Sequence, residues 1–245
     1  MPDFSAISPH LDVRISDRAK RLALRLDASK RRVCLVVPKR ASLKNAYLFA
    51  FQHRDWIEQK IKDIPDGIAL AQDGAIIPVM GRSVTVLIDR TNATRVTDIT
   101  LTETTLAIRS RLDSLEPRVT RYLKKLAAEE FMKLSQEKAA RIEKKVVNLT
   151  VRDMKTRWGS CSTDGRMALS WRLIFAPFEA FDYVIAHEVA HLKHPNHGPK
   201  FWKLCEELSV NFTEGHSWMK LNGHELMRFG IKTVPDAATD EAGAA

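Results

Sequence analysis

The sequence is poor in cysteine and has no long apolar run. Its three cysteines lie far apart and are odd in number, which excludes a disulfide framework as the source of its stability. No stretch approaches the ~20 apolar residues of a membrane-spanning helix. Residues 1–5 lack the basic and then apolar pattern of a secretory signal. We therefore expect a cytoplasmic protein with no membrane partner.

The amino-terminal half also lacks the signatures of several binding architectures. Residues 1–115 contain no Gly-rich phosphate-binding loop, no internal repeat and no low-complexity segment. A nucleotide site built on such a loop is therefore not indicated. Positive charge is abundant instead, because residues 14–40 hold ten Lys and Arg against two Asp, a local net charge of +8.

This positive charge has two interpretations. The chain carries a net charge of +9 over 245 residues, and a local excess of this kind favours polyanions such as nucleic acid or nucleotide phosphates. The alternative is a solvated, highly charged surface. We prefer this alternative for residues 14–40, because no aromatic residues are interleaved with the basic ones.

The hydropathy pattern predicts an α+β fold with two domains. Hydrophobic residues make up 44% of the chain and charged residues 28%, which is ordinary for a globular protein. Residues 1–115 are predicted to form a β-rich, basic subdomain with one helix over 43–62. Residues 116–233 are predicted to form a catalytic domain that begins with a long helix over 117–145. Residues 234–245 are predicted to be a disordered tail.

Three hairpins are expected from runs of alternating apolar residues and from turn signals. They lie at 22–26 with 33–37, at 97–101 with 106–109, and within 153–173. The third hairpin closes on Asp164–Gly165, and it directly precedes the helix that carries the candidate site. It is therefore expected to form the small sheet of the catalytic domain.

The candidate site begins with an H-E-x-x-H motif at residues 187–191. The apolar run before it predicts a helix, on which His187 and His191 stand about 40° apart on one face and about 6 Å apart along the axis. Two imidazoles so placed can bind one zinc ion at about 2.0–2.1 Å each. Glu188 points about 100° away from His187, which suits a general base rather than a ligand.

A third zinc ligand is expected at His197. On a continuous helix His194 would lie about 10 Å from His187 along the axis, too far for the same ion. Pro195 disfavours helix for the residue before it, so the chain is predicted to turn out after Lys193 or His194 and to return His197 to the metal. The offset of His197 matches the third histidine of H-E-x-x-H-x-x-G-x-x-H. A water molecule is expected as the fourth ligand.

Other polar residues near the motif have less certain roles, and each has an ordinary structural alternative. Arg157 and Arg172, from the preceding hairpin, are candidates to stabilise negative charge in the transition state, although arginines more commonly form surface salt bridges. His194 is interpreted as a residue at the rim of the site or behind the ligands. Cys161 is interpreted as a half-buried structural thiol, and His216 as an ordinary surface or capping histidine.

Several segments together resemble the YgjP-like metallopeptidase-domain family, which is similar to the SprT-like and WLM zinc proteases. They are residues 18–22, 54–57, 157–162, 169–174 and 187–202. The resemblance covers nearly the whole chain and implies a zincin-like catalytic domain, a minimal metalloprotease unit in which a β-hairpin or small sheet accompanies the H-E-x-x-H helix. One departure is Ser170, where relatives commonly have Asn, so substrate specificity is left open.

For function, the resemblance implies zinc ligands at His187, His191 and His197 and a catalytic carboxylate at Glu188. We therefore expect a zinc-dependent hydrolase, a metallopeptidase acting on peptide or protein substrates. One ion is expected, and other divalent metals could bind the same imidazoles. Two alternatives stay open: a nucleoside triphosphate hydrolase that uses the same site, and a protease module that its basic half delivers to nucleic acid.

Overall fold

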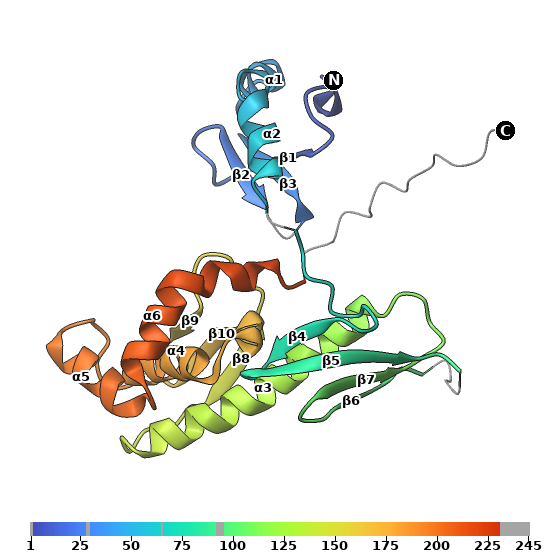
Figure 1. Ribbon diagram of the computed structural model, residues 1–245. Coiled ribbons are helices and arrows are strands. Elements are labelled where there is room, and N and C mark those ends of the chain that lie inside the picture. The colour runs from blue at the N-terminus through green and yellow to red at the C-terminus, as the bar shows by residue number, and fades with distance from the viewer. Residues whose placement is uncertain (1, 28–29, 65, 92–95, 231–245) are drawn as a thin grey trace. The chain divides into compact units, whose positions relative to one another are not determined.

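Figure 1 shows the computed structural model, which describes residues 2–27, 30–64, 66–91 and 96–230. These residues contain six α-helices and three small sheets, so the predicted α+β class is confirmed. The contacts divide the chain into two units. The first comprises the described residues up to Ile68 together with Gly230, and the second is Ala69–Phe229. The predicted tail at 234–245 lies outside the described residues. No helix in the described part is long and apolar enough to cross a membrane.

The first unit packs one three-stranded sheet against two helices. The sheet has the order β1 (Leu11–Ser16), β3 (Arg32–Pro38), β2 (Ala23–Asp27), and a short 3-10 helix, η1 (Phe4–Ala6), precedes it. β2 runs antiparallel to β3, as the predicted hairpin requires, whereas β1 is parallel to β3. Val33, Leu35 and Val37 are buried on the face of β3 that meets the helices.

The prediction of one helix over 43–62 is wrong, because the structure has two helices there, α1 (Leu43–Gln52) and α2 (Arg54–Lys62). The break lies at His53, whose backbone leaves helical geometry at φ −106° and ψ 16°. The His53 ring Nδ1 lies 2.8 Å from the Phe49 carbonyl oxygen, while its backbone N–H donates to Ala50. The ring thus takes the carbonyl that the next turn of a continuous helix would have used.

The second unit begins with a four-stranded sheet. Its order is β4 (Ile76–Val79), β5 (Arg82–Asp89), β7 (Thr105–Arg109), β6 (Asp98–Leu101). The antiparallel pair β6–β7 is the second predicted hairpin.

This sheet belongs to the same compact unit as the candidate site. The sequence predicts a domain boundary at 115/116, but the contacts divide the chain at 68/69. The Met80 N–H donates to the Ile174 carbonyl at 2.6 Å, and the Glu116 carboxylate accepts from the backbone of Leu70 and Ala71 at 3.0–3.1 Å. Composition does not reveal these long-range bonds, which join residues on opposite sides of the predicted boundary.

A long helix, α3 (Glu116–Ala140), packs against the strand 148–152, the 3-10 helix 171–175 and the helix of the site, 178–190 (Figure 1). It ends five residues before the predicted limit of 145. Near its end Lys138 is buried, and its ammonium lies 2.5 Å from Asp182 Oδ1 and donates to the Leu208 carbonyl at 2.6 Å. Asp182 also accepts from the Val210 N–H at 2.8 Å. Three elements of the catalytic unit are therefore joined at one buried ion pair.

The third sheet has the order β8 (Asn148–Arg152), β10 (Arg166–Ser170), β9 (Gly159–Cys161). The antiparallel pair β9–β10 confirms the third predicted hairpin, and β8 runs parallel to β10. Among the described strands β9 pairs with β10 alone, so it is an edge strand of this sheet. β10 ends at Ser170, where the 3-10 helix η3 (Trp171–Phe175) replaces the continued strand that the alternation predicts.

Three helices follow, α4 (Phe178–Ala190), α5 (Pro199–Leu208) and α6 (Phe212–Asn222), with the 3-10 helix η4 (Gly223–Arg228) after them. α4 contacts both of the other helices (Figure 1). Gly215 permits the crossing of α6 over α4, because a Cβ there would lie 2.2 Å from the Glu179 carbonyl oxygen. α4 is therefore enclosed on several sides, which fixes the helix that carries the candidate ligands.

Candidate metal centre

The backbone after α4 turns as the proline predicts. α4 ends at Ala190, and His191 is its C-cap. The last helical bond runs from the His194 N–H to the Ala190 carbonyl, at 2.9 Å. Pro195 cannot continue this pattern because it has no N–H. The chain then returns toward α4, so that His197 stands just before α5.

Three imidazoles meet at this turn. One ring nitrogen from each of His187, His191 and His197 lies within 4.8 Å of the others. The Nε2 atoms of His187 and His197 are 3.1 Å apart. Two nitrogens on a tetrahedral zinc, each about 2.0–2.1 Å from the metal, would be roughly 3.3 Å apart. The spacing of the three nitrogens therefore fits a single ion of this size.

The hydrogen bonds of the rings also fit a metal site. His191 Nδ1 lies 3.2 Å from the His194 carbonyl oxygen, and an N–H at Nδ1 that donates to it leaves the lone pair of Nε2 free for a cation. His194 thus acts on the cluster through its backbone, and its ring is not one of the three that converge. His187 Nδ1 is buried and has no hydrogen-bond partner among the described residues.

The protonation states favour binding of a cation. Burial, and to a smaller extent the neighbouring His191 and His197, lower the pKa of His187 to about 4. Burial likewise lowers the pKa of His191. Both of these rings are therefore neutral at pH 7, which is the form that coordinates a metal. Three converging imidazoles are a suitable donor set for zinc.

Glu188 lies beside this cluster but is directed toward β9. Its side chain is buried, and a Cβ at Gly159 would lie 2.5 Å from its Oε1 atom. Glycine at this position of the edge strand therefore makes room for the carboxylate. Burial raises the pKa of Glu188 to about 7, and the positive charge of Arg157 opposes this increase.

The two candidate arginines differ in their surroundings. Arg157 is exposed, and its charge acts on Glu188. Arg172 is 1% exposed: its Nε donates to the Phe229 carbonyl at 2.8 Å, its Nη1 pairs with Asp153, and its guanidinium lies over the Trp171 ring. These contacts tie η3 to the segment after η4. Of the two, Arg157 is the one that the structure relates to Glu188.

Further aromatic side chains surround the histidines, and the sequence interpretation missed one of them. His216, interpreted as a surface residue, stacks on Phe212 at 5.7 Å and lies 5.4 Å from the Tyr183 ring. The Tyr183 ring also lies 6.1 Å from His187. The charge of His216 also acts on His187. The spacing of Phe212 and His216 by four residues, one face of a helix, was the available signal.

Cys161 is half-buried, as its interpretation as a structural thiol requires. Burial raises its pKa to about 12, and the charge of Glu188 contributes to the same shift. The thiolate is the reactive form of cysteine. At neutral pH the side chain is therefore an inert thiol beside the carboxylate.

Comparison with protein families gives one finding. The model of the YgjP-like, metallopeptidase domain matches residues 20–222. This range includes the three histidines, Glu188 and the whole of the β8–β10–β9 sheet, and it reaches back into the first unit. Comparisons with curated proteins and with solved structures give no match.

Proposed function

The chain belongs to the YgjP-like metallopeptidase-domain family, and from this premise we propose that it is a zinc-dependent peptidase. A family of this kind implies a metal-dependent hydrolase. The observation that carries the finer proposal is the convergence of three imidazole nitrogens within 4.8 Å beside a buried carboxylate. The same arrangement supports a zincin-like layout, in which an edge strand passes the carboxylate of the ligand helix.

His187, His191 and His197 would hold the ion. Zinc bound by three imidazoles supplies Lewis acidity, which polarises a substrate carbonyl and makes water a usable nucleophile near neutral pH. The His194 carbonyl keeps the His191 ring in the orientation and tautomer that binding needs.

Glu188 is the proposed general base. It accepts a proton from the attacking water and then returns this proton to the leaving amine. A carboxylate whose pKa burial raises to about 7 suits both steps. Arg157, whose charge acts on Glu188, is the proposed partner for the negative charge that develops on the substrate.

The edge of β9 is the proposed seat for the substrate backbone. An extended peptide can add to such an edge as a further strand and satisfy the unpaired backbone groups. Gly159 lets the backbone of β9 itself lie close to Glu188, because a Cβ there would be 2.5 Å from Oε1. A scissile bond carried along β9 would thus pass the carboxylate.

The test combines metal content with a substrate panel. Glu188→Gln should keep one zinc per chain and lose about 10²- to 10⁴-fold in kcat on unfolded peptides, because the proton carrier is removed. His197→Ala should lose the zinc, whereas His224→Ala, at an exposed histidine outside the cluster, should keep it. Full activity of Glu188→Gln would remove the role assigned to that carboxylate. Pyrophosphate or phosphate release from nucleotides without any peptide cleavage would replace the peptidase by a nucleotide hydrolase.

A further inference from the structure

The outer face of the β8–β10–β9 sheet carries a hollow of about 350 Å³. Thr150, Ala168 and Ser160 face each other across the three strands. Paired residues in a sheet point to the same face, so the methyl group of Ala168 lies between two small polar side chains. The short side chains form the floor of the hollow.

Three arginines line this hollow, together with polar side chains, and none of the lining residues is a carboxylate. Arg152 and Arg166 come from β8 and β10, at opposite ends of the sheet, and Arg157 comes from the segment before β9. Arg166 pairs with Asp164 at 2.6 Å, at the edge of the hollow. Arg152 donates only to the Thr150 hydroxyl, at 3.3 Å, within the described residues. The hollow therefore holds more positive charge than its surroundings neutralise.

β9 connects the hollow to the candidate metal centre. Successive residues of a strand point to opposite faces, and here Gly159 faces Glu188 whereas Ser160 faces the hollow. Arg157 lines the hollow and also acts on Glu188. A peptide that adds to the edge of β9 would accordingly present alternate side chains to the two faces, one set toward the carboxylate and the other toward the arginines.

We propose that this arginine hollow, formed by Arg152, Arg157 and Arg166 around Ala168, is a specificity subsite that binds an acidic side chain of the polypeptide substrate. The inference rests on the proposed peptidase function and names the class of substrate. The guanidinium groups would donate charge-assisted hydrogen bonds to the Asp or Glu carboxylate. One such contact is worth about a tenfold to hundredfold preference over an uncharged side chain of the same shape.

A nucleic-acid backbone fits the same hollow less well. Proteins that bind single strands without sequence preference combine a groove that follows several phosphates with aromatic side chains on which bases stack. This hollow has no aromatic residue in its lining, and its three arginines line one local hollow of about 350 Å³. One anionic side chain matches that arrangement better than a continuous polyanion.

The experiment compares peptides that differ only in one residue, Glu, Gln or Lys, at each position around the cleaved bond. The wild-type protein should cleave the Glu peptide with about 10- to 100-fold higher kcat/KM than the Gln peptide at one of these positions. In Arg152→Glu/Arg166→Glu this preference should disappear or turn toward Lys. The matched control is Arg121→Glu/Lys133→Glu, which makes the same change of charge at exposed positions of α3 and should keep the preference for Glu.

Binding separates a failure of this inference from a failure of the proposed function. The Glu188→Gln variant is mixed with fluorescent Glu and Gln peptides and with a single-stranded oligonucleotide, and anisotropy is measured at several salt concentrations. Cleavage without any charge preference would overturn the subsite and leave the peptidase. Binding that prefers the Glu peptide, with no cleavage of any peptide by the wild-type protein, would support the subsite and overturn the peptidase. If the oligonucleotide alone is bound, and the arginine substitutions abolish this binding, the subsite for acidic side chains is wrong.

Discussion

Two sheets of the second unit carry hollows built in the same way, but they differ in charge. In the four-stranded sheet, Ala107 lies between Leu87 and Thr100 and forms the floor of a hollow of about 430 Å³. In the β8–β10–β9 sheet, Ala168 has the same position and the hollow measures about 350 Å³. A short side chain at the centre of three strands is enough to make either one.

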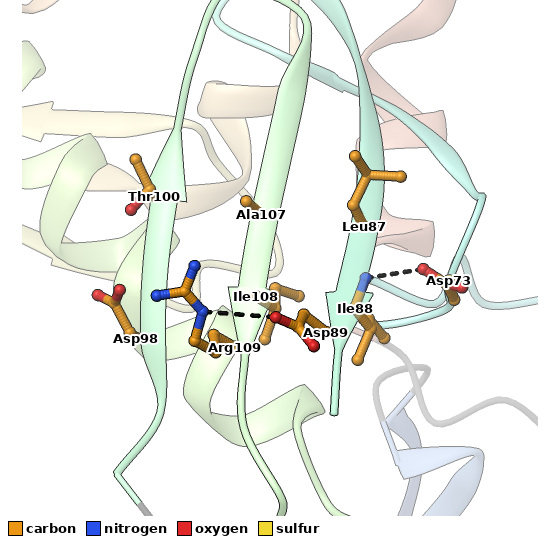
Figure 2. Close-up of a pocket in the computed structure, with 9 residues that line it drawn as sticks. All are labelled: Asp73, Leu87, Ile88, Asp89, Asp98, Thr100, Ala107, Ile108 and Arg109. Atoms are coloured by element: carbon orange, nitrogen blue, oxygen red, sulfur yellow. Dashed lines mark hydrogen bonds and ion pairs between the residues drawn. The ribbon is translucent and has the colours of Figure 1, made fainter. Parts of the chain in front are cut away.

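The first of these hollows is acidic, because its lining has the carboxylates of Asp73, Asp89 and Asp98 and the single guanidinium of Arg109. Figure 2 shows Arg109 in a row with Asp98 and Asp89, and its Nε lies 3.6 Å from Asp89 Oδ2. Asp73 accepts a hydrogen bond from the Ile88 N–H at 2.7 Å. The arginine hollow has three guanidinium groups and no carboxylate in its lining. Concavity alone therefore does not identify a site; the excess of positive charge and the nearby Glu188 distinguish the second hollow.

The largest loss of activity is expected from a substitution that displaces Glu188 from its position behind the arginine hollow. Gly159→Ala places a methyl group 2.5 Å from Glu188 Oε1, so the carboxylate must move. We expect a loss of about 100-fold in peptidase kcat/KM with the zinc content and the fold unchanged. Ser160→Ala, next to it but on the other face, should keep far more activity. Equal activity of the two variants would show that β9 does not lie against Glu188 during the reaction.

A matched pair of substitutions at the floors of the two hollows tests whether the preference for Glu peptides depends on the arginine hollow alone. Ala168→Met fills the arginine hollow without changing its charge, and we expect the preference for Glu peptides to fall about tenfold. Ala107→Met makes the same change in the hollow of Figure 2 and should leave that preference unaltered. Peptide kinetics measure both, and thermal unfolding checks that each variant is folded. If both variants lose the preference, the effect is not local to the arginine hollow.

The smallest effect is expected in the hollow of Figure 2. Arg109→Ala removes the ion pair with Asp89, in which the Arg109 side chain is 60% exposed and the Asp89 side chain 41% exposed. Solvent screens such pairs, so the free energy of unfolding should change by no more than about 1 kcal/mol. Chemical denaturation measures this change. A much larger loss would mean that the row of charges in Figure 2 contributes substantially to the stability of the four-stranded sheet.

Much of the local structure was predictable from short-range patterns. Each of the three predicted hairpins is present, because alternation and turn residues act within a few positions. The break at His53 in the predicted helix over 43–62 was not predictable. The His53 ring competes for a backbone carbonyl, and apolar periodicity does not report this competition. The boundary at 68/69 was also missed, because it depends on bonds between distant segments, such as Met80 with Ile174.

Among the polar residues too, positions set by local spacing were predictable, and positions set by tertiary packing were not. The convergence of His187, His191 and His197 follows from helical spacing and from the turn at Pro195, both of which are local. The burial of Arg172 against Phe229 and the approach of His216 to Tyr183 depend on tertiary packing. The neighbours of Arg172 in the chain do not separate it from an ordinary surface residue, and the one local signal for His216 was its spacing from Phe212.

The candidate metal ligands and the candidate base could be read from the sequence alone: two histidines one helical turn apart, a carboxylate between them, and a proline that returns a third histidine. These relations extend over eleven residues, so the backbone geometry of one helix and one turn is sufficient to set them. The surroundings of Glu188 and of the three histidines became known from the tertiary structure. The registers of β8 and β9 against β10 bring Thr150 and Ser160 beside Ala168 in the arginine hollow, and the packing of β9 on α4 places Gly159 against Glu188. Both depend on contacts between segments that are separate in the chain.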